Sequence, residues 1–201
     1  MRRLFAIVTL LCASILLALN VYAANSADAE AVVKDTTNKV LDALKSSSNQ
    51  EVYTLVEKVV SPHFNFPKMS RLVLKRRNWR RASEEEKEDF VKAFRGLLVC
   101  TYTKALTDAG AGKVHKINYS TVANRPRKTI ISANVYPTGK NQVLKVNYVM
   151  SYFSKWQVYN VIVGDVNLVA HYRTQFAKYL KNKDIEDLIQ KIQTQNHTCR
   201  K

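Results

Sequence analysis

The spacing of apolar residues changes twice along this chain. From residue 27 to residue 108 they recur three and four positions apart, which is the spacing of amphipathic helices. From Val114 to Val163 apolar and polar residues largely alternate, as they do in the strands of a sheet. Beyond Val166 the helical spacing returns. This order predicts an α+β fold in which helices, an antiparallel sheet and further helices pack together.

Helices are expected both before and after the strands along the chain. Ser83 and Glu86 have the spacing of a capping box, so a long helix is expected to start directly after Ser83. The basic run Lys75–Arg81 is expected to be a connector. The other expected helices are Ala27–Leu44, Glu51–Val60, a segment that starts at Pro62, Val166–Leu180 and a segment capped by Asp184.

The sheet is expected to have four strands joined by short connectors. Connectors of this length join antiparallel neighbours, so the predicted sheet is a four-stranded antiparallel meander. Its strands are Val114–Thr121, Thr129–Tyr136, Val143–Tyr152 and Trp156–Val163.

The last predicted strand is apolar on both of its faces. An antiparallel sheet usually leaves one face in water, yet each large apolar side chain gains about 1.5–3 kcal/mol from burial. Two arrangements satisfy this pattern. Helices cover both faces, which is the commoner outcome, or one face lines an apolar cavity. The two sets are Trp156, Val158 and Ile162 on one side and Tyr159, Val161 and Val163 on the other.

Residues 1–23 have the features of a secretory signal peptide. Arg2 and Arg3 precede an apolar run, and a small-residue site allows cleavage near Ala23 and Ala24. An uncleaved N-terminal anchor is the alternative. We therefore expect a single exported domain over residues 24–195, located in the periplasm, followed by a flexible polar tail over residues 196–201.

The exported chain is strongly basic. Residues 1–23 hold two arginines and no acid, so their removal lowers the net charge from +16 to +14. Such a surface attracts lipid headgroups, lipopolysaccharide or nucleic acid, and export argues against nucleic acid. The cluster Arg71–Arg81, which contains Trp79, is a candidate docking surface. A solvated turn whose Trp79 packs into the core is the alternative.

No catalytic or metal-binding pattern is present in the sequence. It has no glycine-rich phosphate loop and no Gly-x-Ser-x-Gly elbow, and its four histidines lack metal-ligand spacing. We therefore expect a binding protein without a cofactor, not an enzyme. Cys100 and Cys199 can pair in an oxidising compartment, and two unpaired thiols are the other possibility.

Three stretches of the chain resemble one known family. The first runs from Ser61 to Arg80, the second from Phe90 to Tyr102 and the third from Trp156 to Phe176, in which Tyr-Arg-x-Gln-Phe follows Trp-x-Val-Tyr. In order and spacing they resemble the MlaC, or toluene-tolerance, family over most of the chain, from Ala27 to Ile192.

The resemblance implies a soluble periplasmic phospholipid carrier of the Mla lipid transport pathway in Gram-negative bacteria. Such a carrier holds phospholipid tails in an apolar cavity between the sheet and the helices, and a monomer is expected. Its implied partners are an inner-membrane ABC transporter with an MCE-domain ring and an outer-membrane lipoprotein–porin complex. The system helps to maintain the lipid asymmetry of the outer membrane.

The candidate cavity residues lie on the wide apolar faces of the long helix, the sheet and the returning helix. Ordinary core packing is the alternative for each of them. Arg127 and Arg173 are candidates for contacting a lipid phosphate, because a guanidinium can grip it with two hydrogen bonds. A surface ion pair is the alternative for both. The cavity candidates are Phe94, Leu98, Tyr102, Val146, Tyr148, Tyr159, Val161, Val163, Leu168, Val169, Tyr172 and Phe176.

The chain also departs from the family pattern. The resemblance leads us to expect acids at Asn65, Asn147 and Asn160 and a Glu-Gly pair near Gly164-Asp165. The missing acids make the chain more basic and leave two alternatives open. One is a hopanoid-linked paralogue of the same family. The other is an exported basic module that docks on anionic membrane or lipopolysaccharide surfaces without a lipid cavity.

Overall fold

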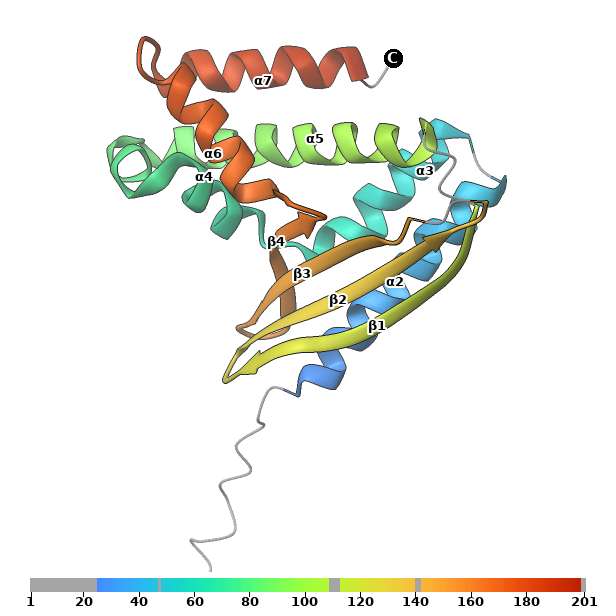
Figure 1. Ribbon diagram of the computed structural model, residues 1–201. Helices are drawn as coiled ribbons and strands as arrows, with labels where there is room; N and C mark the ends of the chain where they lie inside the picture. The colour runs from blue at the N-terminus through green and yellow to red at the C-terminus, as the bar shows by residue number, and fades with distance from the viewer. Residues whose placement is uncertain (1–24, 47, 109–112, 140–141, 200–201) are drawn as a thin grey trace, which may run out of the picture.

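Helices pack on one face and at one end of a curved antiparallel sheet (Figure 1). The computed structural model describes residues 25–46, 48–108, 113–139 and 142–199. The predicted signal peptide lies outside these described residues. The architecture is α+β, as the alternation of apolar residues predicts.

The sheet has five antiparallel strands in the order β1-β2-β3-β4-β5, one more than predicted. The extra strand is short, and in it Val166, which was expected to be helical, pairs with Val163. Gly164 makes the tight turn between them with a φ of 56°, a conformation that glycine adopts without strain. The strands are β1 Val114–Arg125, β2 Lys128–Pro137, β3 Leu144–Tyr152, β4 Trp156–Val163 and β5 Val166–Asn167.

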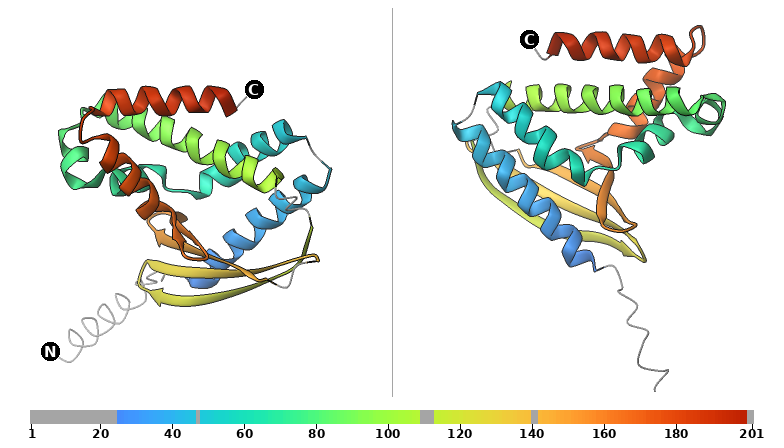
Figure 2. Two further views of the ribbon diagram at one scale, coloured as in Figure 1. Left: turned by 45° about the horizontal axis from the view of Figure 1, so that its top comes forward. Right: turned by 180° about the vertical axis from the view of Figure 1, so that it is seen from behind.

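The two faces of the sheet differ in their chemistry. The face that packs on α2 (Ser26–Ser46), which we call the inner face, is apolar, and Figure 2 shows α2 lying along it. The opposite, outer face is largely polar. Inner-face rows across β2, β3 and β4 are Ile131–Tyr148–Val161 and Ala133–Val146–Val163, and outer-face rows are Lys128–Ser151–Gln157 and Ser132–Asn147–Ile162.

The remaining helices form a second layer at one end of the sheet (Figure 1). Within this layer α5 lies against α7, and α4 lies against α6. Their shared core is aromatic: Phe94 meets Tyr172 and Phe176 edge to face, with ring centroids 5.3 Å and 5.7 Å apart. The elements are α3 Asn49–Leu55, the π-helical turn η1 Val56–Val60, the 3-10 turn η2 Ser61–His63, α4 Phe66–Arg81, α5 Glu84–Asp108, α6 Leu168–Tyr179 and α7 Ile185–Cys199.

Side-chain caps determine where several helices start. Ser83 and Glu86 exchange the two hydrogen bonds of a capping box, at 3.0 Å and 2.7 Å, so this prediction is confirmed. Asn65 Oδ1 caps α4, and Asn160 Oδ1 accepts from the amide of Val169 in α6. Asn and Asp cap helices about equally well. These two departures from the family pattern therefore fill structural roles without adding negative charge.

The prediction that Lys75–Arg81 is a connector was wrong. Helix α4 continues through this run and is interrupted only at Lys75, whose φ of 61° and ψ of 161° are not helical. The carbonyl of Leu72 belongs to the last turn before the interruption, where carbonyls commonly need a partner from outside the helix. Arg173 Nε of α6 donates to that carbonyl at 3.1 Å, which ties α6 to α4 at the break.

The expected flexible tail is also corrected, because α7 continues to Cys199. Asn196 is buried, and its side-chain amide donates to the carbonyl of Ala93 in α5 at 2.9 Å. Cys100 of α5 is disulfide-bonded. The side chain of Cys199, its predicted partner, lies outside the described residues.

Helices α5 and α7 approach each other closely at Gly96, so a substitution at this residue tests their packing. A Cβ at residue 96 would lie 2.6 Å from Asn196 Nδ2, so Gly96→Ala should displace the amide from its hydrogen bond. The buried hydrogen bond is worth about 1–3 kcal/mol, against a gain of about 1 kcal/mol in helix propensity. We expect Gly96→Ala to lower the free energy of unfolding by about 1 kcal/mol in denaturant titrations.

The control for this prediction is the same substitution in an Asn196→Ala background. With no amide to displace, Gly96→Ala should then raise the free energy of unfolding by about 1 kcal/mol. Destabilisation of the same size in both backgrounds would contradict the proposed contact.

Candidate functional site

The inner face of the sheet is closed at one end and partly open at the other. Met150 and Val158 are buried with α2 in an apolar cluster. Further along the same face, Val146 and Val163 pair across β3 and β4 but remain only half-buried. A close-packed interior would bury such side chains, so the open end of this face lacks full cover.

The helices around this open end also leave apolar side chains partly exposed. On α5, Tyr102 and Leu106 are 37% and 36% exposed. The turn η1 buries none of its residues, although Val56 and Val59 are apolar. It contacts α2, α3 and α5, and π-helical turns are frequent at functional sites. We call the set Val56, Val59, Tyr102, Leu106, Val146, Tyr148, Val161 and Val163 the inner apolar surface.

Tyr148 lies deep within the protein. Burial raises its pKa to about 12, and a hydrogen bond with the side chain of Thr37 in α2 partly opposes this rise. Nevertheless, the side chain of Tyr148 is only half-buried with respect to solvent. Deep burial together with residual exposure is the pattern expected of a residue that borders an internal space.

Tyr102 on α5 is more exposed than Tyr148, at 37%, but it is also partly shielded from water. Burial, followed by the neighbouring Tyr172, raises its pKa to about 12. Its hydroxyl is hydrogen-bonded to Tyr172, which belongs to the closed aromatic core. Tyr102 therefore marks the boundary on α5 between the packed core and the inner apolar surface.

The predicted cavity residues fall into two groups. One group lies in the closed core, where ordinary packing describes each residue: Phe94, Leu98, Leu168, Val169, Tyr172 and Phe176. The other group belongs to the inner apolar surface: Tyr102, Val146, Tyr148, Val161 and Val163. Tyr159 joins neither group fully, since it packs at the edge of the core with Lys68 Nζ 3.5 Å from its ring centroid.

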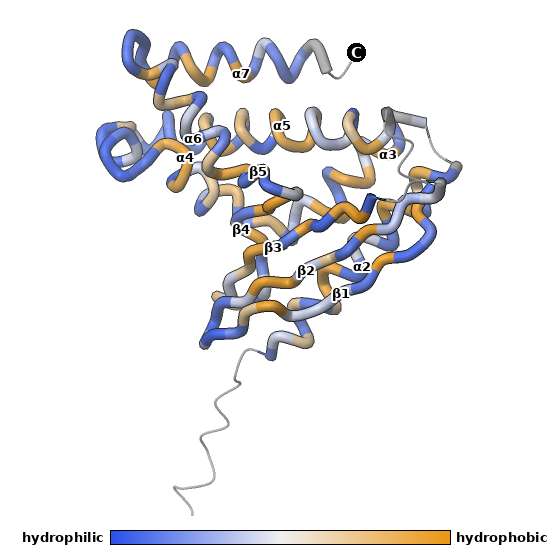
Figure 3. The backbone as a smooth tube through the Cα atoms, viewed as in Figure 1, coloured by the Kyte–Doolittle hydropathy of each residue, from blue (hydrophilic) through white to orange (hydrophobic). Residues whose placement is uncertain are grey.

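Sequence reasoning missed the contributions of η1 and of Leu106 to this surface. Val56 and Val59 fit a helical stripe, and nothing in that spacing marks a π-helical turn. Leu106 lies near the end of α5, and its 36% exposure is not visible in the spacing of apolar residues. Figure 3 shows apolar residues both on the sheet and on the helices that face it. Only the exposed fraction of each side chain identifies the apolar residues that other residues do not cover.

Both headgroup candidates make hydrogen bonds within the protein. Arg173 holds the carbonyl of Leu72. Arg127 donates to the carbonyls of Tyr152 and Phe153 at 3.3 Å and 3.2 Å. Within the described ranges neither arginine has a carboxylate partner. The contacts of both arginines to a lipid phosphate stay a prediction.

The predicted basic cluster is brought together at the end of α4. Arg76, Arg77, Arg80 and Arg81 line a shallow hollow of about 650 Å³. Trp79 is half-buried against the core, which confirms the structural alternative for this residue.

The part of the chain that the structure describes contains no group of three or more His, Cys, Asp or Glu that could hold a metal ion. In the same ranges, no helix combines the length and apolarity needed to cross a bilayer. The residues of the inner apolar surface themselves offer hydrophobic contacts and the hydroxyl groups of Tyr102 and Tyr148 to a ligand.

Comparisons with known proteins agree with this architecture. A family model described as MlaC protein matches residues 34–194. Among solved structures, the phospholipid-binding protein from Ralstonia solanacearum, in complex with a phospholipid, is similar with a TM-score of 0.74 and 24% sequence identity. The match covers 87% of this chain and 99% of that chain. No curated protein matches the chain.

The raised pKa values of Tyr102 and Tyr148 should be visible in an alkaline titration. The unfolded chain loses their protons near pH 10, whereas the folded protein keeps them until about pH 12. Folded stability should therefore fall between these pH values, because the unfolded state binds fewer protons there. In phenolate absorbance, Tyr102→Phe and Tyr148→Phe should each remove one late-ionising group. A late phase that neither substitution changes would refute the deep placement.

Proposed function

This chain belongs to the MlaC protein family, and on that basis we propose that it binds phospholipid and carries it through the periplasm. The observation that carries the proposal is the inner apolar surface, where half-buried Val146, Tyr148, Val161 and Val163 share one face of the sheet. The similar Ralstonia solanacearum protein binds a phospholipid, which supports the same ligand class here.

Acyl chains are the ligand that matches this surface. Each CH₂ group that leaves water gains about 0.8 kcal/mol, and the side chains that it covers gain burial as well. An acyl chain needs no specific polar partner, which fits the inner apolar surface, since the polar side-chain groups among its eight described residues are the hydroxyls of Tyr102 and Tyr148. The phospholipid headgroup, in contrast, would remain near solvent, because its charge is costly to bury.

The wider role follows from the family and forms part of the proposal. After cleavage near Ala23, a monomeric carrier would exchange lipid with an inner-membrane ABC transporter that bears an MCE-domain ring. Its other partner would be an outer-membrane lipoprotein–porin complex, and the exchange would help to maintain outer-membrane lipid asymmetry. Binding and exchange require no cofactor and no reaction.

Lipid loading can be measured directly by native mass spectrometry. The protein purified without its signal peptide should carry a co-purified ligand with the mass of a phospholipid. Protein that is consistently lipid-free, and that takes up no phospholipid from vesicles, would rule out the proposed function.

Two substitutions test whether the ligand lies on the inner apolar surface. Val161→Glu and Leu106→Glu each add a charge that acyl chains cannot solvate, so both variants should lose most of their bound lipid. Leu106 is already 36% exposed, so its variant should still fold, as circular dichroism would show. The matched control is Val166→Glu, at a site that is 55% exposed and outside this surface. Equal lipid loading in all three folded variants would refute the assignment.

A further inference from the structure

Phe153 is the most exposed large apolar side chain in the described residues, at 82%. It follows β3 at the turn into β4, beside the turn that joins β1 to β2. This end of the sheet is separate from the inner apolar surface, since Tyr152 and Tyr148, the member of that surface nearest to it on β3, are about 13 Å apart along the strand. A large aromatic side chain that is exposed to water at such a site indicates an interaction surface.

The two turns are joined into one rigid unit by Arg127. Its carbonyl accepts from the amide of Tyr152 at 2.9 Å. Its guanidinium donates to the carbonyls of Tyr152 and Phe153 and lies 5.8 Å from the centre of the Phe153 ring. Arg127 does this with a φ of 59°, a conformation that strains any residue except glycine. These contacts anchor the backbone at Phe153 and place the Arg127 guanidinium beside the exposed ring.

Cations surround Phe153 at this end of the sheet. Arg125, Arg127 and Lys128 lie at the first turn and Lys155 at the second, and the sequence between Val114 and Val163 contains no Asp or Glu. Figure 3 shows the turn between β1 and β2 as hydrophilic. The first turn of α2 reaches the same end and adds one carboxylate, Asp28.

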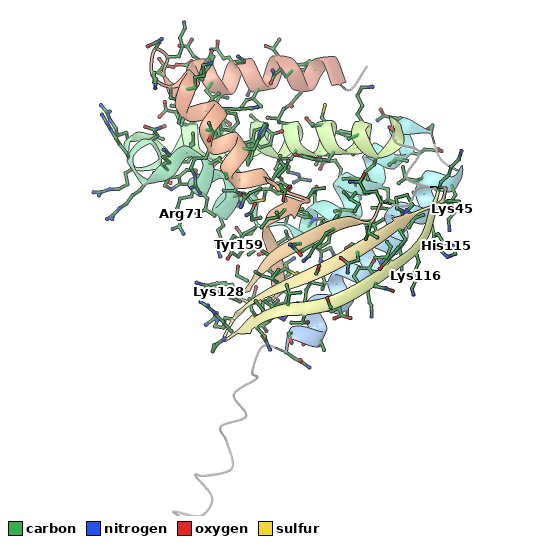
Figure 4. All side chains as sticks on the ribbon, in the orientation of Figure 1. Lys45, Arg71, His115, Lys116, Lys128 and Tyr159 are labelled. Atoms are coloured by element: carbon green, nitrogen blue, oxygen red, sulfur yellow. The ribbon has the colours of Figure 1, made fainter. Side chains whose placement is uncertain are left out.

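Helix α4 extends this positive surface across the outer face. Lys68 Nζ donates to Ser151 of β3 at 3.0 Å. Burial, followed by Lys128 and Arg71, lowers the pKa of Lys68, which shows that the three cations act on one another. Arg71, Lys128 and the Tyr159 ring lie along the same edge in Figure 4.

We propose that Phe153, Arg125, Arg127, Lys128 and Lys155, which we call the hairpin tip, dock the protein on an anionic lipid bilayer. An aromatic ring that projects from a ring of cations matches a surface with phosphates outside and hydrocarbon below. The ring enters the interface while the cations contact anionic headgroups. This site is separate from the inner apolar surface, so docking and lipid loading can fail independently.

Vesicle binding of the purified full-length mature protein tests the hairpin tip. The wild type should bind vesicles made of equal parts phosphatidylglycerol and phosphatidylcholine, bind pure phosphatidylcholine weakly, and dissociate as salt rises. Phe153→Ser should lower the partition coefficient about tenfold. Arg125→Gln combined with Lys155→Gln should lower it by a similar factor. Both variants should retain co-purified lipid.

Three controls separate the hairpin tip from other surfaces. Val166→Ser removes another exposed apolar side chain, at 55% exposure, and should bind like wild type. Lys178→Gln with Lys181→Gln removes the same charge from the end of α6 and should also bind nearly like wild type. Arg76→Gln with Arg77→Gln tests the arginine hollow of α4. If only the Arg76→Gln and Arg77→Gln variant loses vesicle binding, the proposal is overturned. It is also overturned if the wild type does not bind anionic vesicles, since docking would then need a protein partner.

Insertion of the ring has its own measurement. In a Phe153→Trp variant, phospholipids brominated on their acyl chains should quench the added fluorescence, measured as the difference from the wild-type signal of buried Trp156 and half-buried Trp79. Circular dichroism will show that the variants are folded, which the exposure of residue 153 leads us to expect. Vesicle binding without quenching at residue 153 would contradict insertion.

Discussion

The structure depends on one constraint: the inner face of the sheet is too apolar for water, and its helices cover only part of it. α2 closes one end by burying Met150, Trp156 and Val158. At the other end, α5 makes its extensive contacts with α3, α4 and α7 instead of with the sheet. The aromatic core around Phe94 holds α5 in that position. The protein therefore keeps an uncovered apolar surface because its packing energy is concentrated elsewhere.

Several polar residues support this arrangement of a closed core and a partly open sheet face. Asn65 caps α4, Asn160 of β4 accepts a hydrogen bond from the Val169 amide in the first turn of α6, and Arg173 donates to the Leu72 carbonyl near the break in α4. None of these groups needs a negative charge, and the strands from Val114 to Val163 carry none. A strongly cationic surface thus coexists with an apolar interior, and the two proposed contacts with lipid use different parts of the sheet.

The sequence predicted the helices and strands well, but it did not predict how completely they cover one another. The run Trp156–Phe176 forms the predicted strand, turn and helix, because two-residue and four-residue periodicities are local signals. The break at Lys75 and the continuation of α7 past Asn196 depend on Arg173 and Ala93, which are far away in sequence. Likewise, spacing shows that Val161 and Phe176 are apolar, but only the packed structure distinguishes half-buried Val161 from buried Phe176.

The central claim is that acyl chains lie against the inner apolar surface. Solution NMR of the protein loaded with isotope-labelled phospholipid tests it most directly. The account predicts intermolecular nuclear Overhauser contacts from acyl CH₂ groups to the methyls of Val146, Val161 and Val163 and to the Tyr148 ring. Contacts confined to Phe153 or to the outer face, with none to these four residues, would contradict it.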